Sequence, residues 1–123
     1  MSTENTIDVV RLALSLHETR AQVAGMNVAR AGKPDATALK VDFASIEAKL
    51  REAASSGDES AIAGQIESAA NELRSLRPET TLDPILLDAQ IGEIAAAGVE
   101  YQALTEALSR QFGLMRIAIA GRV

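Results

Sequence analysis

One uninterrupted pattern of apolar residues in the last third of the chain constrains the fold more than any other feature. From Leu87 to Ile119 the apolar positions lie alternately four and three residues apart. This spacing places side chains on one face of an α-helix, with the 3.5-residue period of helices that pack along one another. The ten positions, eight of them apolar, are Leu87, Ile91, Ile94, Gly98, Tyr101, Thr105, Leu108, Phe112, Met115 and Ile119. The pattern predicts a long helix packed lengthwise against another helix.

The predicted helix covers residues 83–120. Asp83 is a suitable N-cap, Pro84 is tolerated in a first turn, and Gly121 is a typical helix stop. Acidic side chains precede basic ones along it, which suits the helix dipole; they are Asp88, Glu93, Glu100 and Glu106, then Arg110, Arg116 and Arg122. At a rise of 1.5 Å per residue such a helix is on the order of 54 Å long. That length exceeds the surface of a compact domain of this size, so we expect a partner for it.

Composition excludes several classes of function. The 123 residues form one domain, with a net charge of −5, one tyrosine, two phenylalanines and no cysteine. Acidic charge and scarce aromatics argue against nucleic-acid binding. Without cysteine there is no disulfide framework, thiolate zinc site or cysteine nucleophile. We expect neither a cleaved secretory signal at residues 1–8 nor a membrane-spanning stretch.

A second long helix is predicted over residues 5–31, and it is apolar on two opposite faces. The first stripe contains Ile7, Val10, Leu14, His17, Ala21, Ala24 and Val28, and the second contains Val9, Leu12, Leu16, Thr19, Val23 and Met26. An offset of two residues separates the stripes by roughly 200° around the helix. Two interpretations follow. Either this is a central helix wrapped by the rest of the chain, or one face meets the C-terminal helix and the other meets a neighbouring subunit.

Residues 41–80 form a variable middle of shorter elements. A turn is predicted at residues 32–35 and a loop or short extended segment at residues 36–40. Helices are predicted at residues 41–54 and 59–76, separated by a break at residues 55–58, and a linker at residues 77–81 leads into the long helix. The expected fold is all-α, with the long terminal helices packed as an antiparallel, coiled-coil-like pair and the shorter helices between them.

Catalytic chemistry is not predicted. His17 is the only histidine, and on an apolar stripe it is best interpreted as a packed side chain. No metal-ligand set, phosphate-binding loop or nucleophile motif occurs, so we expect no enzyme activity, cofactor, metal or small-molecule substrate. Gly92, Gly98 and Gly113 lie inside the long helix, where each costs about 1 kcal/mol relative to alanine. Together with Ala95–Ala97 they favour close approach of another backbone.

The C-terminal segment Glu100–Ile119, with Tyr101-Gln102, an apolar run and Arg116-Ile117-Ala118-Ile119, resembles the last helix of the flagellar basal-body proximal rod protein family, FlgB. Residues 13–20 leading to Asn27-Val28-Ala29 resemble the first helix of that family and the start of its rod motif. Residues 41–44 resemble its short Asp-Phe element. Residues 30–35 differ from the Thr-Pro-Gly turn with which the family continues the motif.

The resemblance implies a structural component of the bacterial flagellar basal-body rod that associates with itself and with other axial proteins. It also implies export through the flagellar type III apparatus without a cleaved signal, and a periplasmic location in the rod. The expected assembly interface combines the second stripe of the first helix with the C-terminal helix. Its residues are Val9, Leu12, Leu16, Val23, Met26, Asn27, Tyr101, Leu108, Phe112, Met115 and Ile119.

A second function also fits the size and the acidic charge. The chain could serve as a soluble helical adaptor or export chaperone that offers one face to a client helix. An assembly subunit would be found with hook–basal bodies, whereas an adaptor would remain with its client.

Overall fold

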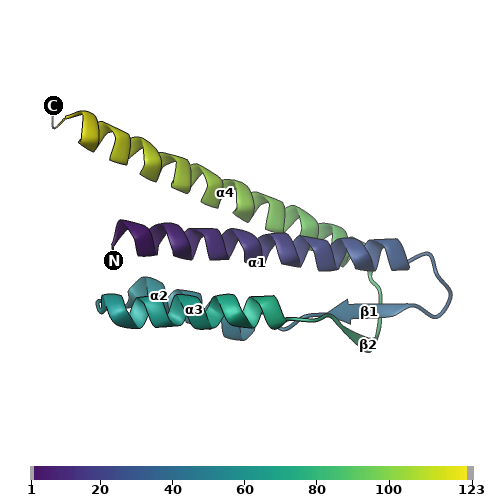
Figure 1. The fold of residues 1–123 in the computed structure, drawn as a ribbon. Coiled ribbons are helices and arrows are strands. Elements are labelled where there is room, and N and C mark those ends of the chain that lie inside the picture. The colour runs from purple at the N-terminus through teal and green to yellow at the C-terminus, as the bar shows by residue number, and fades with distance from the viewer. Residues whose placement is uncertain (1, 122–123) are drawn as a thin grey trace.

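The computed structural model describes residues 2–121, in which four helices and a two-stranded sheet form (Figure 1). The elements are α1 (Thr3–Arg30), β1 (Thr37–Lys40), α2 (Ala44–Ser55), α3 (Glu59–Ser75), β2 (Glu79–Pro84) and α4 (Leu87–Ala120). The predicted all-α fold with two long terminal helices packed against each other is confirmed. Arg122, the last base of the predicted C-terminal helix, lies outside the described residues.

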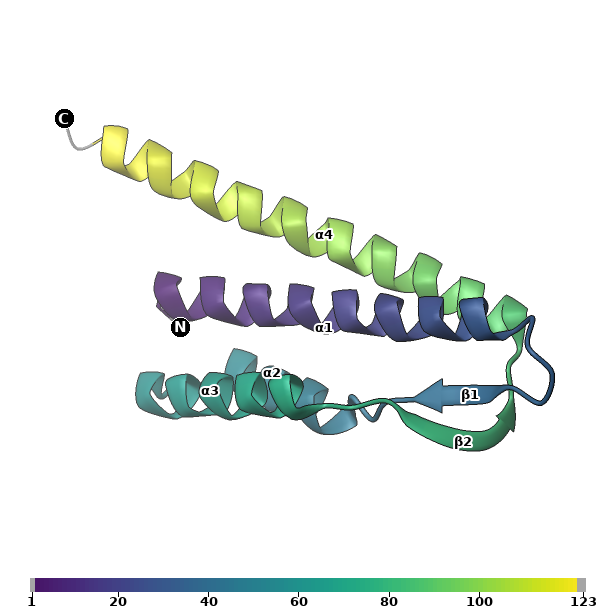
Figure 2. The ribbon, with the colours of Figure 1, turned by 45° about the vertical axis from the view of Figure 1, so that its right-hand side comes forward.

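The helices are arranged in layers around α1. In Figures 1 and 2, α4 lies on one side of α1, and α2 and α3 lie on the other. α1 and α4 run in opposite directions and diverge toward the end that holds the start of α1 and the end of α4. Of the two interpretations of the N-terminal helix, the structure therefore has the central helix wrapped by the rest of the chain.

The main apolar core lies between α1, α2 and α3. Leu12 and Leu16 of α1 are buried against Ile46 and Leu50 of α2 and Ala69 of α3. Half-buried residues complete this core, namely Val9, Ala13, Phe43, Ile66, Ala70, Leu73 and Leu76. Each buried leucine or isoleucine contributes roughly 1.5–3 kcal/mol by leaving water. The second stripe of α1 is thus covered largely by the chain's own shorter helices.

Local capping explains where two of the helices begin. The side chain of Ser2 accepts a hydrogen bond of 3.1 Å from the backbone N–H of Asn5, so α1 starts two residues before the predicted position. The carboxylate of Asp58 accepts hydrogen bonds from the N–H groups of Ser60 and Ala61 at the start of α3. The predicted helices of the middle region are present, with small shifts at their ends.

The sheet was not predicted as a sheet. Residues 36–40 were expected to be a loop or short extended segment and residues 77–81 a linker, but β1 and β2 pair as antiparallel strands. Thr37 lies opposite Pro84, and Lys40 lies opposite Glu79, with an irregularity between Thr37 and Leu39. Strands of this length are too short to give a periodic signal.

The predicted start of the C-terminal helix was wrong. Asp83 and Pro84 belong to β2, and α4 begins at Leu87 after an N-cap residue, Leu86, that makes no side-chain capping bond. This segment pairs with β1 instead, with Pro84 opposite Thr37. The hydroxyl of Thr81, in the same strand, donates a 2.8 Å hydrogen bond to the carbonyl oxygen of Ala38 in β1. The predicted end was correct, since α4 stops at Ala120 with Gly121 as its C-cap.

Candidate assembly surface

The covered face of α4 combines polar and apolar residues. Among the described residues of α4, Ala97 is the one that is buried, with 1% of its surface exposed. On either side of Ala97, Gln90 and Glu93 accept hydrogen bonds from Asn27 and Arg20 of α1, and Glu100 lies close to His17 and Arg20. The two long helices are therefore aligned by specific polar contacts as well as by apolar packing.

Arg20 of α1 is the centre of the largest group of charges at this contact. Its Nε and Nη2 atoms donate hydrogen bonds of 2.9 and 2.6 Å to the same carboxylate oxygen of Glu93. Its Nη1 atom lies 3.6 Å from Glu100 of α4 and 3.8 Å from Glu47 of α2. Partial burial works to lower the pKa of Arg20, but the hydrogen bond to Glu93 and the three carboxylates outweigh it, so the pKa is raised. Arg20 thus joins all three layers in its fully charged form.

His17 lies one turn before Arg20 and faces the same group of acids. Its Nδ1 atom is buried and lies 2.9 Å from a carboxylate oxygen of Glu100. The prediction that His17 is a packed side chain agrees with this half-buried position between α1 and α4.

Asn27 connects α1 to both the sheet and α4. It is 2% exposed, the one polar side chain that is fully buried among residues 2–121. Its amide oxygen accepts a 2.7 Å bond from the N–H of Leu39, and its amide nitrogen donates to the carbonyl oxygen of Leu39 and to the side chain of Gln90. Asn27 therefore holds β1 and the first turn of α4 in place. It was predicted as an interface residue, but here the chain itself satisfies and covers it.

These polar contacts decide which face of α4 points inward. In its first half the inner face is one residue out of step with the predicted stripe, because Ala97 is buried where Gly98 was expected. One residue corresponds to a rotation of about 100° around a helix. In this half of the helix the predicted stripe therefore lies to one side of the contact with α1, where Ile94, Gly98 and Tyr101 face a groove that α1 also lines. We call its ten positions, from Leu87 to Ile119, the outer stripe.

The outer stripe is largely uncovered by the chain. Its exposed large side chains have between 36% and 68% of their surface accessible; they are Leu87, Ile91, Ile94, Tyr101, Phe112 and Ile119. Leu108 and Met115 are half-buried. Within residues 2–121, every exposed large hydrophobic residue except Met26 lies in the segment 82–119. Val99, Leu114 and Ile117 are exposed on other faces of α4. So many exposed large apolar side chains on one helix are typical of a surface that binds another protein.

A groove lies between α1 and the first half of the outer stripe. It has a volume of about 380 Å³ and is lined by His17, Glu18, Ala21, Ile94, Ala97, Gly98 and Tyr101. A side-chain carbon added at Gly98 would meet no atom within 4 Å, and the same is true at Gly92 and Gly113. The predicted close approach of another backbone to these glycines is therefore not made within the chain. The space beside Gly98 stays open.

The predicted interface residues divide into two groups. Leu12, Leu16 and Val23 are buried by the chain itself, Val9 is half-buried, and Met26 is exposed. An interface through the buried residues would require α2 and α3 to move away from α1. By contrast, the predicted residues of α4 are Tyr101, Leu108, Phe112, Met115 and Ile119, and all of them are exposed or half-buried. The available assembly surface therefore lies on α4.

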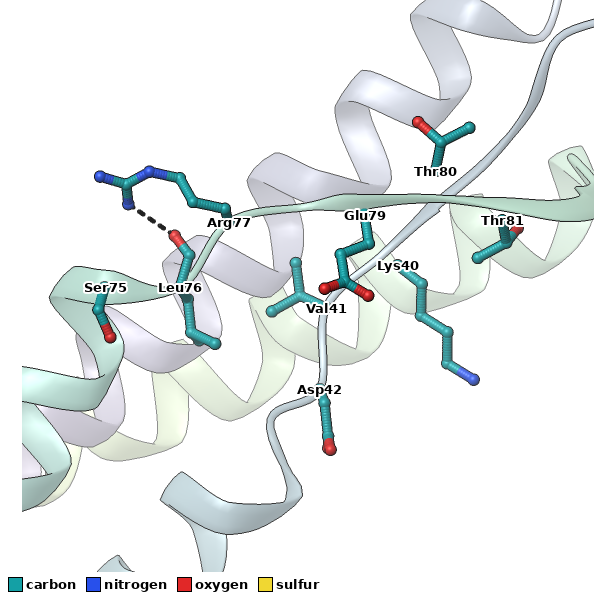
Figure 3. A pocket seen from close by; sticks show the side chains of 9 residues that line it. All are labelled: Lys40, Val41, Asp42, Ser75, Leu76, Arg77, Glu79, Thr80 and Thr81. Atoms are coloured by element: carbon teal, nitrogen blue, oxygen red, sulfur yellow. Dashed lines mark hydrogen bonds between the residues drawn. The ribbon is translucent and has the colours of Figure 1, made fainter.

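A second hollow lies at the junction of the sheet with α2 and α3 (Figure 3). It measures about 410 Å³ and is bordered by charged side chains, among them Lys40, Asp42 and Glu79. Arg77 points away from these residues and donates a hydrogen bond to the carbonyl oxygen of Leu76 (Figure 3). It also donates to the carbonyl oxygen of Arg74 at the end of α3. The guanidinium of Arg77 therefore binds carbonyl oxygens at the C-terminal end of α3. Mixed charges in an open hollow indicate no particular ligand.

Within residues 2–121, no three histidine, cysteine, aspartate or glutamate side chains come together in a way that could hold a metal ion. None of the helices described there is both long and apolar enough to cross a membrane.

No protein-family model, curated protein or solved structure matches this chain. The resemblance to the rod protein family therefore rests on the residues quoted for it above.

Proposed function

We propose that this chain is a structural subunit of the bacterial flagellar basal-body rod. It assembles through α4 with copies of itself and with other axial proteins, and it has no enzymatic role. The observation that carries the proposal is the exposure of six large side chains of the outer stripe, spread from Leu87 to Ile119. A helix of 34 residues with an apolar face open to water gains its full burial only when another helix covers that face.

The location and the route follow from the same proposal. The subunit is exported through the flagellar type III apparatus without a cleaved signal and takes its place in the periplasmic rod. Passage through a narrow channel requires a chain that unfolds readily. α4 suits this requirement because much of its stabilisation is gained only on assembly. The unassembled subunit therefore has less stabilisation to lose when it unfolds for export.

The test compares two substitutions on different faces of α4. Phe112 belongs to the outer stripe, whereas Ile117 is also exposed but lies about 140° away around the helix. In the bacterium that encodes the chain, we expect cells with Ile117→Asp to swim and to carry the protein in purified hook–basal bodies. Cells with Phe112→Asp should do neither. Absence of the wild-type protein from basal bodies, or normal swimming with Phe112→Asp, would overturn the proposal.

A helical adaptor or export chaperone is the second candidate. The core between α1, α2 and α3 favours it, because a chaperone must be folded before it meets a client and this core needs no partner. The same fractionation separates the two functions. An adaptor stays in the cytosol with a client protein, whereas a rod subunit is recovered with the basal body.

A further inference from the structure

We infer that two copies of the chain pair through their outer stripes, with the two α4 helices antiparallel about a two-fold axis beside residue 103. The inference rests on the proposed role of the outer stripe as an assembly surface, and it names the first partner of that surface as a second copy. The spacing of the stripe, the sizes of its side chains and the charges beside it support this pairing independently.

The spacing of the outer stripe is symmetric about its midpoint. In an antiparallel pair, residues that face each other have numbers with a constant sum. With a sum of 206, each of the ten positions faces another position of the same stripe. The facing pairs are Leu87 with Ile119, Ile91 with Met115, Ile94 with Phe112, Gly98 with Leu108, and Tyr101 with Thr105. A two-fold pair therefore buries the whole stripe of both copies in one register.

Side-chain sizes match in the same register. The two positions of the stripe without a large side chain, Gly98 and Thr105, face Leu108 and Tyr101 of the second copy. The space beside Gly98 is open and forms part of the groove between α4 and α1. Leu108 of the second copy can enter this groove as a knob enters a hole, which is how paired helices pack.

Charges on the two flanks of the stripe also fit an antiparallel pair. On the flank away from α1, Asp88 of one copy lies next to Arg116 of the other, and the symmetry makes this contact twice. Within one helix these residues are 28 positions apart, which is about 42 Å. In a parallel pair they would remain at opposite ends. The flank toward α1 carries Gln90, Ala97, Leu104 and Gln111, which are uncharged.

The surface is large enough for a specific contact. The stripe is about 48 Å long, and a helix is about 10 Å wide, so pairing buries on the order of 1,000 Å² from the two helices together. This is about the minimum for a specific protein interface, and α1 adds to it at the groove. A two-fold contact is closed and cannot extend into a filament. The pair is therefore a form that covers the stripe before the subunit meets its axial partners.

Charge reversal tests the pairing directly. In sedimentation experiments at low salt, we expect Asp88→Arg and Arg116→Asp each to weaken dimerisation about fivefold, because two ion pairs become two repulsions. The double variant should return the affinity to within about twofold of the wild type. Glu106→Arg alters an exposed charge of α4 that lies outside the outer stripe, and it serves as the control. A double variant that is weaker than either single variant would overturn the inference, as would a wild type that stays monomeric.

Single cysteines test the direction of the helices in this cysteine-free chain. Gln102 lies beside the two-fold axis, so Gln102→Cys should join two copies through a short thiol cross-linker. Asp88→Cys should not, because the two positions 88 lie at opposite ends of an antiparallel pair. Cross-linking at both positions would indicate a parallel pair and contradict the inference. Neither outcome decides the rod function, which depends on recovery of the wild-type protein with basal bodies.

Discussion

The three-helix core and α4 are stabilised in different ways, although all their helices show clear apolar periodicity. In α1, α2 and α3 the apolar stripes face one another and are buried. In α4 the inner face is held by Arg20, Asn27 and their partners, while most large side chains of the apolar stripe remain exposed. The difference shows that periodicity identifies a face that will be buried but does not say by which molecule.

The largest effect should come from the core. Leu16 is 2% exposed and packs among the three helices. We expect Leu16→Ala to lower the free energy of unfolding by about 2–5 kcal/mol, because it leaves a cavity. Leu114→Ala in α4 removes the same atoms from an exposed position and should cost less than about 1 kcal/mol. Chemical denaturation of both variants measures the contrast, and equal losses would remove the distinction between the two regions.

Asn27 sharpens the comparison, because it joins the core to α4. Asn27→Ala leaves the backbone groups of Leu39 and the side chain of Gln90 without their partner. We expect a loss of about 1–3 kcal/mol in the free energy of unfolding. Amide exchange should show faster opening of β1 and of the start of α4 than of α2 and α3. Gln22→Ala, at an exposed position of α1, is the matched control and should change neither quantity.

The charged contact should have a smaller effect. Arg20→Gln removes the bonds to Glu93 and the attraction of Glu47 and Glu100. Because these carboxylates are partly exposed and screened by water, we expect a loss of about 1 kcal/mol, reduced further by salt. Arg11→Gln changes an exposed arginine of the same helix and should have little effect. A loss for Arg20→Gln that does not change with salt would contradict an electrostatic origin.

The smallest effect concerns the ion pair between α2 and α3. Hydrogen bonds from Lys49 and Ser45 lower the pKa of Glu72 below its ordinary value of 4.5. A carboxyl with a lowered folded-state pKa adds stability above its unfolded pKa and loses it as the pH falls through the folded pKa. We therefore expect Glu72→Gln to be less stable than the wild type at neutral pH, by at most about 1 kcal/mol. This difference should vanish in acid.

Thermal unfolding at a series of pH values measures this difference. Glu67→Gln, at an exposed position of α3, is the control. A gap between the wild type and Glu72→Gln that persists below the pKa of Glu72 would show that the ion pair is not its cause.

The helices could be predicted from the sequence because their periods are long and regular. The two long terminal helices, the shorter helices between them and the end at Gly121 follow from local patterns. The strands could not be predicted, because strands as short as Thr37–Lys40 and Glu79–Pro84 depend on each other and on Asn27. The predicted start of α4 was wrong for the same reason, because Asp83 and Pro84 belong to β2.

The candidate surface could be predicted only in part. The stripe from Leu87 to Ile119 was predicted to pack against another helix, and five of its residues were predicted as assembly residues, but the pattern alone does not say which face of α4 contacts α1. One signal could have shown this. Arg20 and Asn27 are seven residues apart on α1, and Glu93 and Glu100 are seven apart on α4. Residues seven apart share a face, so these polar sets mark the faces that meet. Which polar side chains pair is a tertiary contact that single-helix patterns do not contain.

Amide hydrogen exchange at increasing protein concentration tests the central claim most directly, namely that the outer stripe of α4 is completed by another molecule. We predict that protection of residues 87–119 rises with concentration, while protection of α1, α2 and α3 stays constant because their core is internal. If α4 is already as protected as the core in dilute solution and does not respond to concentration, the stripe needs no partner and the account is contradicted.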